Sequence, residues 1–186
     1  MTVLYLVRHA HVDWTPDEDR PLSERGCADA QQVADLLQPF PISAVYSSPS
    51  RRAHDTVAPL ANRLGLPIRE IDDLRERDLG SALPGSFMAA IRATWADPIS
   101  AFPGGESNAA AQRRGVAVIQ GLLDRHAAQQ IAVGTHGNLL ALILQHFDPS
   151  VGFVFWQSLT MPDVYRLEVR DGRAAHDRLR PFSSQG

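Results

Sequence analysis

The segment Met1-Thr-Val-Leu-Tyr-Leu-Val-Arg-His-Ala10 opens the chain with an apolar run that ends in two basic residues. Residues 3–7 show little alternation between apolar and polar side chains, which is typical of a strand buried on both faces of a parallel sheet. Open α/β sheets bind ligands outside the carboxyl ends of their strands. A guanidinium at Arg8 and an imidazole at His9 therefore predict a ligand site at the end of this strand.

Further along the chain, short apolar runs alternate with longer segments of helical periodicity. We predict further strands at residues 42–46, 67–71, 131–134, 153–156, 164–169 and 174–179. We predict helices at residues 24–37, 53–64, 87–95, 107–126 and 139–147, with Cys27 on the buried stripe of the first. This order predicts an α/β fold, a three-layer α/β/α sandwich with a mostly parallel central sheet and antiparallel edge strands. Without repeats or a linker, we expect one domain over residues 1–186.

The composition excludes several classes of function. A net charge of −3 gives no reason to expect a nucleic-acid partner. No apolar run approaches the about 18 residues of a membrane span, and we see no signal peptide, so we expect no membrane partner. The single cysteine, Cys27, fits a cytoplasmic location. All 18 basic residues are arginine, which excludes mechanisms based on a Schiff-base or phosphate-loop lysine.

Polar residues follow three of the predicted strands at their carboxyl ends. Arg8-His9 ends the first, Ser47 to Arg52 follows the second, and Thr135-His-Gly137 follows the strand at 131–134. Two arginines and two histidines at one sheet edge suit a tetrahedral dianion, because guanidinium groups bind its oxygens bidentately and the helix starts can add N–H groups. A histidine in such a site can form a covalent phosphoimidazole, and neighbouring guanidinium groups favour its neutral form.

The leaving oxygen of a phosphoryl transfer needs a proton, which a loop carboxylate can supply. Glu76 is our candidate, and Asp78 and Glu106 stay open as alternatives. A rival interpretation is a metal site, because His9-x-His11-x-Asp13 resembles metal-ligand spacing. We favour it less, because it would leave arginines beside a cation, and we expect His11 at the rim of the site.

Five motifs in this order resemble the histidine phosphatase superfamily, which includes the phosphoglycerate mutase-like enzymes. They are Leu6-Val-Arg-His-Ala10, Ser47-Ser-Pro-Ser-Arg-Arg-Ala-His-Asp-Thr56, Leu74-Arg-Glu-Arg-Asp-Leu-Gly80, Pro103-Gly-Gly-Glu-Ser107 and Val133-Gly-Thr-His-Gly-Asn138. The resemblance implies that His9 is the catalytic nucleophile and Glu76 the acid and base. It implies that Arg8, Arg52 and His136 bind the phosphoryl group, and that no metal or other cofactor takes part.

The resemblance implies a phosphatase that acts on a phosphorylated small molecule or on phosphohistidine, with a phosphoprotein as a further option. A phosphoglycerate mutase-type phosphotransferase and a non-catalytic binder of phosphorylated ligands are the alternatives. The chain departs from many members after the nucleophile, where it has Ala10, Val12 and Thr15, and after the acid, where it has Gly80-Ser-Ala-Leu-Pro-Gly85. These departures leave the substrate open, and the sequence does not decide the oligomeric state.

Overall fold

The computed structural model describes residues 1–186 apart from 14, 16–18, 82, 84, 171–172 and 180–186. Its sheet has the strand order β3-β2-β4-β1-β5-β6. The strands are β1 (Thr2–Arg8), β2 (Ile42–Ser47), β3 (Ile68–Glu70), β4 (Gln130–Thr135), β5 (Asp163–Arg170) and β6 (Arg173–Arg178). The first four are parallel, and β5 and β6 join as antiparallel strands beside β1. The predicted α/β class, with a mostly parallel sheet and antiparallel edge, is confirmed.

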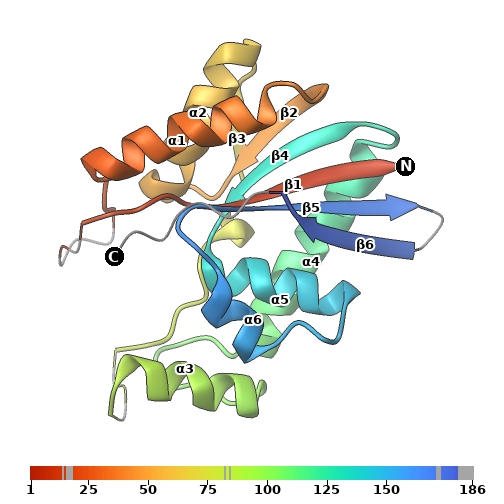
Figure 1. Cartoon of the computed structure of the whole chain (residues 1–186). Coiled ribbons are helices and arrows are strands. Elements are labelled where there is room, and N and C mark those ends of the chain that lie inside the picture. The colour runs from red at the N-terminus through yellow and green to blue at the C-terminus, as the bar shows by residue number, and fades with distance from the viewer. Residues whose placement is uncertain (14, 16–18, 82, 84, 171–172, 180–186) are drawn as a thin grey trace.

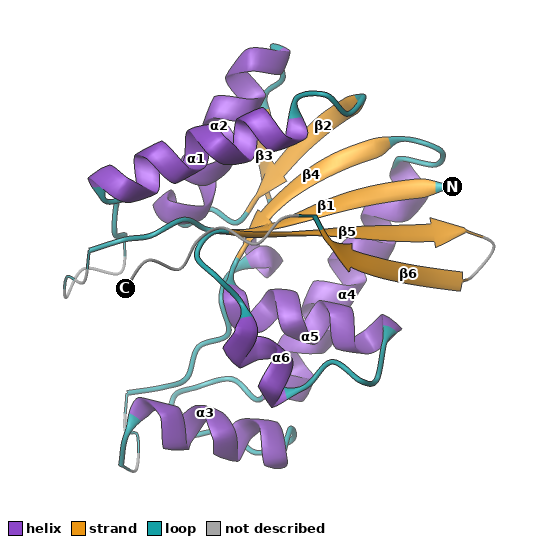
Figure 2. Ribbon diagram, viewed as in Figure 1, coloured by secondary structure: helices purple, strands orange, loops and turns teal. Residues whose placement is uncertain are grey.

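Helices cover both faces of this sheet (Figures 1 and 2). They are α1 (Glu24–Leu37), α2 (Arg51–Leu64), α3 (Phe87–Ala96), α4 (Asn108–Arg125), α5 (Gly137–Phe147) and α6 (Phe153–Ser158), with a short 3-10 helix at Asp72–Leu74. Helices α1 and α2 lie on one face, and α4, α5 and α6 lie on the other. Helix α3 lies beyond α5 and α6, away from the sheet.

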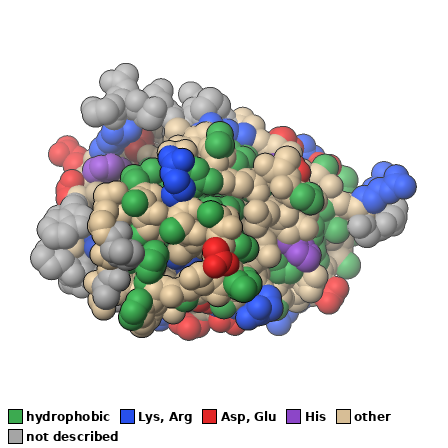
Figure 3. Space-filling model, turned by 90° about the horizontal axis from the view of Figure 1, so that it is seen from below, with side chains coloured by type: hydrophobic (Ala, Val, Ile, Leu, Met, Phe, Trp, Pro, Cys, Tyr) green, Lys and Arg blue, Asp and Glu red, His purple; other side chains and the backbone are tan. Residues whose placement is uncertain are grey.

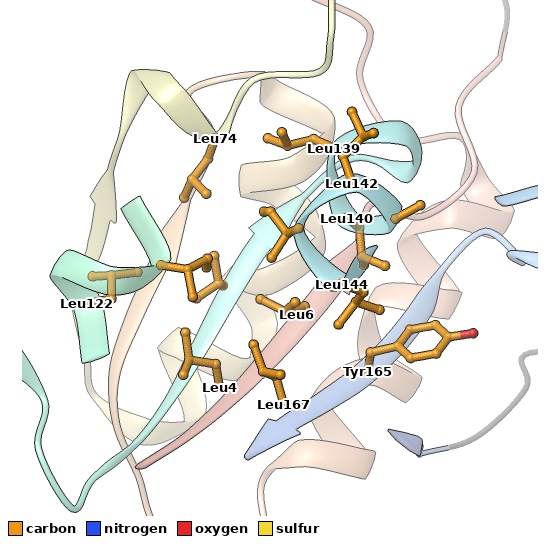
Figure 4. Close-up of a cluster of buried hydrophobic side chains, with 14 of the residues drawn as sticks. Leu4, Leu6, Leu74, Leu122, Leu139, Leu140, Leu142, Leu144, Tyr165 and Leu167 are labelled. Carbon is orange, nitrogen blue, oxygen red and sulfur yellow. The ribbon is translucent and has the colours of Figure 1, made fainter. Parts of the chain in front are cut away.

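Strand β1 is buried on both faces, as its sequence predicted. Leu4 and Leu6 pack into the cluster formed with α4 and α5, which Figure 4 shows in close-up. Val3, Tyr5 and Val7 pack into the second cluster, formed with α1 and α2. Each of these side chains is at most 1% exposed. Because side chains along a strand alternate between the two faces, this one strand contributes to both hydrophobic clusters.

The strand register brings the polar strand ends side by side. Arg8 is paired with Thr135 across β1 and β4, and Ser47 is paired with Gly134 across β2 and β4. Because β1, β2 and β4 are parallel neighbours, their carboxyl ends lie at one edge of the sheet. The residues that follow them start loops or helices from nearly the same place.

Two local predictions are wrong. Residues 153–156 were predicted as a strand and form helix α6 instead. Phe155 packs against Tyr165 of β5, so the aromatic run covers the sheet rather than joining it. Cys27 was predicted in the core and is exposed, because α1 buries Gly26 in its place. A side chain at 26 would meet the backbone oxygen of His11 at 2.0 Å.

Among the described residues, no helix is long and apolar enough to cross a membrane. Figure 3 views the molecule from below, toward α3 and α6, and shows hydrophobic side chains scattered among other residues on this face.

Candidate active site

Backbone and side-chain hydrogen bonds lock the three strand ends together. The His9 N–H donates to the carbonyl of Thr135 (3.0 Å), and the Ser48 N–H donates to that of Gly134 (2.9 Å). Buried Thr56 joins α2 to the same point, because its hydroxyl accepts from the Ala10 N–H (2.9 Å) and donates to the Arg52 carbonyl (2.7 Å). Ala10, just after β1, is therefore joined to the start of α2.

His9 is held as a neutral imidazole with a defined tautomer. Its Nδ1 lies 2.9 Å from the Ala10 carbonyl, which can only accept, so Nδ1 carries the proton. Burial, with the charges of Arg52, Arg8 and Arg20, lowers the pKa of His9 from 6.5 to about 3. A neutral ring protonated on Nδ1 has its lone pair on Nε2, which makes no hydrogen bond within the described part of the chain. This is the form of histidine that acts as a nucleophile.

His136 lies against His9, with ring centroids 5.3 Å apart and the rings edge to face. It is fully buried, and burial together with His9 and Arg52 lowers its pKa well below 6.5. Its Nε2 lies 2.9 Å from the Ser48 hydroxyl. Its Nδ1 is buried and has no hydrogen-bond partner among the described residues. A buried ring nitrogen without a partner costs free energy, which a bound ligand would recover.

Arg8 is held by the segment that leads into β5, the neighbour of β1. Its Nη1 donates to the carbonyls of Leu159 (3.0 Å) and Thr160 (3.2 Å), in the turn between α6 and β5. The guanidinium also lies over Gly137, where a Cβ would come within 2.8 Å of Nε. Burial lowers the pKa of Arg8, while the carboxylates of Glu76 and Asp163 act in the opposite direction.

Arg52 and Arg20 add positive charge to the same place. The charge of Arg52 lowers the pKa of both His9 and His136, and that of Arg20 lowers the pKa of His9. Arg51, the alternative to Arg52, is exposed and forms an ion pair with Asp55. The electrostatics therefore favour Arg52 as the second arginine of the site.

Glu76 sits at the start of α5, directly beyond His136. Its Oε2 accepts from the Asn138 N–H (3.0 Å), and its Oε1 accepts from the N–H groups of Leu139 (3.0 Å) and Arg77 (2.9 Å). A carboxylate at a helix N-terminus is favourable, because the first N–H groups have no partner within the helix. Two of the N–H groups at the start of α5, where we expected N–H groups to be available to an anion, thus bind Glu76.

The two other candidate carboxylates are placed differently. Glu106 is bound by Arg114 through both of its oxygens (2.9 and 2.7 Å). Asp78 is exposed and accepts from the Gly80 N–H (2.8 Å). Of the three, only Glu76 is among the carboxylates that act on Arg8.

His11, which we expected at the rim of the site, has a half-buried side chain whose Nδ1 lies 2.8 Å from the hydroxyl of Ser23. Within the described ranges, no group of three or more His, Cys, Asp or Glu side chains is placed to hold a metal ion.

Sequence reasoning missed several residues that shape this site. Arg20 lies in the loop after β1, far from the strand-end motifs, and only its effect on His9 marks it. Ser48 and Thr56 lie inside one of the sequence motifs. The residues that their hydroxyl groups contact, His136 and Ala10, are distant in sequence and come close only in the folded chain. The structure brings together six residues of the sequence motifs, which are Arg8, His9, Arg52, Glu76, His136 and Gly137.

A model of the histidine phosphatase superfamily (branch 1) matches residues 4–180. The chain is 30% identical over 182 residues to phosphoglycerate mutase-like protein 4 of Arabidopsis thaliana, covering 88% of this chain and 79% of that protein. It is 30% identical over 162 residues to the metal-independent phosphoserine phosphatase of the same plant, covering 77% and 67%. The solved structure of Bacillus stearothermophilus YhfR superposes with a TM-score of 0.80 at 25% identity, covering 98% of each chain.

The strand ends thus bring two histidines and positively charged arginines together at one edge of the sheet. With the family match over nearly the whole length, this chain belongs to the histidine phosphatase superfamily.

Proposed function

We propose that this protein is a metal-independent phosphatase that hydrolyses phosphomonoesters through a covalent phosphohistidine on His9. The observation that carries the proposal is the state of His9, which is neutral, protonated on Nδ1 and surrounded by arginines. Burial and the charges of these arginines keep the nucleophile neutral, and the same positive charge favours a bound dianion. The membership in a phosphatase superfamily supports the same conclusion.

In the first step, the Nε2 lone pair of His9 attacks phosphorus and the bond to the leaving oxygen breaks. Protonated Glu76 gives its proton to that oxygen, so an alcohol leaves and a carboxylate remains. The ring of His9 becomes positively charged, and its Nδ1–H bond to Ala10 stabilises that charge. Arg8, Arg52 and the Nδ1 of His136 bind the phosphoryl oxygens as charge builds on them.

In the second step, water attacks the phosphohistidine. The Glu76 carboxylate takes a proton from the water, the N–P bond breaks, and inorganic phosphate leaves. His9 returns to its neutral form and Glu76 to its protonated form, so the cycle is balanced without a further reactant. Because Oε2 of Glu76 accepts only one hydrogen bond in the described residues, it has room for the proton it must carry.

The substrate in this proposal is a phosphorylated small molecule. One relative is named as a phosphoserine phosphatase and another as phosphoglycerate mutase-like, so carboxylate-bearing phosphomonoesters are the first compounds to assay. Phosphohistidine and a phosphoprotein are the next candidates. The cytoplasmic location and the lack of nucleic-acid and membrane partners stay predictions from composition.

The test is to trap the phosphoenzyme. Wild-type protein mixed with phosphate-labelled substrate and quenched in alkali is expected to carry label on His9. His9→Asn is expected to lose about 10³-fold or more of its turnover of 4-nitrophenyl phosphate, while His11→Asn, at the rim, serves as the control. Turnover by His9→Asn at the wild-type rate would refute the nucleophile assignment.

The same assay separates the alternatives. A mutase would pass the label to a second phosphoacceptor without net release of phosphate. A non-catalytic binder would bind inorganic phosphate but turn over none of the substrates tested. Loss of turnover after treatment with a chelator, restored by a divalent metal ion, would favour a metal mechanism.

A further inference from the structure

The loop that carries Glu76 is not held by a hydrophobic core along its whole length. We define the acid loop as residues 74–80. Leu74 at its start is fully buried. Beyond it, Glu76 and Asp78 line an open cleft of about 420 Å³, and Glu106 and Arg114 line the same cleft. The Glu76 carboxylate is bound by the start of α5, and on the side of the cleft the backbone that carries it is held by hydrogen bonds.

Arg114 of α4 supplies most of these bonds. Its Nη1 donates to the carbonyls of Asp73 (2.6 Å) and Arg75 (2.9 Å), and its Nη2 donates to that of Glu76 (3.4 Å). Its Nε and Nη2 also bind both oxygens of Glu106, at 2.9 and 2.7 Å. Both side chains are largely buried, with 19% and 24% of their surfaces exposed. A guanidinium has the planar set of donors that this arrangement requires, and a lysine does not.

A glycine-rich turn holds Glu106 against the same loop. The Glu106 N–H donates to the Asp78 carbonyl at 2.7 Å. Gly80 and Gly105 lie so close that a Cβ on Gly105 would meet the Leu79 carbonyl carbon at 2.7 Å, and one on Gly80 would meet the Pro103 oxygen at 2.6 Å. Only residues without a side chain allow two backbones to approach in this way. The Pro103-Gly-Gly-Glu sequence thus has a packing role that the catalytic residues do not explain.

We propose that Arg114, braced by Glu106 and the turn at residues 103–106, is a positioning residue that sets the location of the proton donor Glu76. The inference rests on the proposed role of Glu76 as proton donor. Arg114 does not touch the reacting atoms in this proposal. It acts on the backbone of residues 73–76, and through that backbone on the carboxylate at the start of α5.

The role makes a specific kinetic prediction. Proton donation matters when the leaving group is a poor one, and matters little when the leaving group is already stable as an anion. We therefore compare kcat/KM for an alkyl phosphate, phosphoserine, with kcat/KM for 4-nitrophenyl phosphate. This parameter reports the steps up to departure of the leaving group, so the later role of Glu76 as a base does not enter it.

Glu76→Gln provides the reference, with an expected loss of about 10²-fold or more on phosphoserine and little loss on 4-nitrophenyl phosphate. Arg114→Met is expected to show the same selective loss, about 10-fold to 10²-fold, because small displacements of a catalytic group are costly. Glu106→Gln should show a weaker loss of the same kind, and it covers the case in which Arg114→Met fails to fold. Arg113→Met, at the exposed neighbouring position, removes the same charge as a control.

The double variant Arg114→Met/Glu76→Gln tests whether Arg114 acts through Glu76. If Arg114 acts through Glu76, adding its substitution to Glu76→Gln should cost little more on phosphoserine. Equal losses on both substrates, or no loss, in folded Arg114→Met and Glu106→Gln would overturn the positioning role while a selective Glu76→Gln effect leaves the proposed function intact. A non-selective Glu76→Gln effect would overturn the acid assignment itself, and the positioning role with it.

Discussion

The two neutral histidines should make the protein sensitive to mild acid. The pKa of His9 falls from 6.5 to about 3 on folding, so between these values the unfolded chain binds a proton that the folded chain does not. The stability that depends on a neutral His9 is therefore complete above pH 6.5 and is lost as the pH falls toward 3. One pKa unit corresponds to about 1.36 kcal/mol, so at about pH 4.5, two units below 6.5, His9 alone costs about 2.7 kcal/mol.

Urea unfolding at about pH 7 and about pH 4.5, in buffer without phosphate, measures this cost. Other groups also titrate in this range, so the informative quantity is the pH-dependent loss in wild type minus that in His9→Asn. We expect a difference of about 2.7 kcal/mol. His146→Asn, at an exposed position of α5, is the matched control and should lose as much as wild type. Equal losses in wild type and His9→Asn would show that the folded protein does not hold His9 neutral, and would remove the basis for its nucleophilic form.

Three further substitutions probe the support of the site. Gly137→Ala places a methyl group 2.8 Å from Nε of Arg8 and should lower kcat/KM about 10²-fold in a 4-nitrophenyl phosphate assay with the fold kept; wild-type activity would contradict the packing. Asp163→Ala removes a fully buried carboxylate from its ion pair and should cost about 3 kcal/mol or more in urea unfolding; a loss below 1 kcal/mol would argue against it. Arg52→Met should raise the pKa of both site histidines toward 6.5 in an NMR titration, whereas Arg51→Met should not, and unchanged values would separate Arg52 from the site.

The strand ends were predictable because a strand buried on both faces can be recognised from its own apolar residues. Val3 to Val7 are apolar on both faces, so the sequence fixes the strand and the place where Arg8 and His9 emerge. Parallel neighbouring strands end at the same edge of a sheet. This geometry alone predicts that His136, after β4, lies near His9, after β1. The start of α1 at Ser23 was also predictable, since its side chain accepts from the Gly26 N–H as an N-cap.

The failures at Cys27 and Arg114 have a different cause, because there the deciding partner is the main chain and not a side chain. Gly26 is buried where α1 lies against the backbone oxygen of His11. A pattern of apolar side chains does not include a glycine, so it predicts Cys27 as the buried residue instead. Arg114 was missed because three of its acceptors are main-chain carbonyls, which every residue has. Helix α6 was missed because a short aromatic run fits a strand or a helix equally well, and its packing on Tyr165 decides.

Arg8, at the end of the first strand, is held in place by residues of the last two strands and the segment before them. The Thr160 N–H donates to buried Asp163, and Arg178 of the last strand closes an ion pair with the same carboxylate. The carbonyls of Leu159 and Thr160 are thereby fixed, and they direct the guanidinium of Arg8. The antiparallel strands β5 and β6 contribute no group to the proposed chemistry. They hold Arg8, whose charge helps to keep His9 neutral and which binds the phosphoryl oxygens in the proposed mechanism, so this edge of the sheet supports the proposed site.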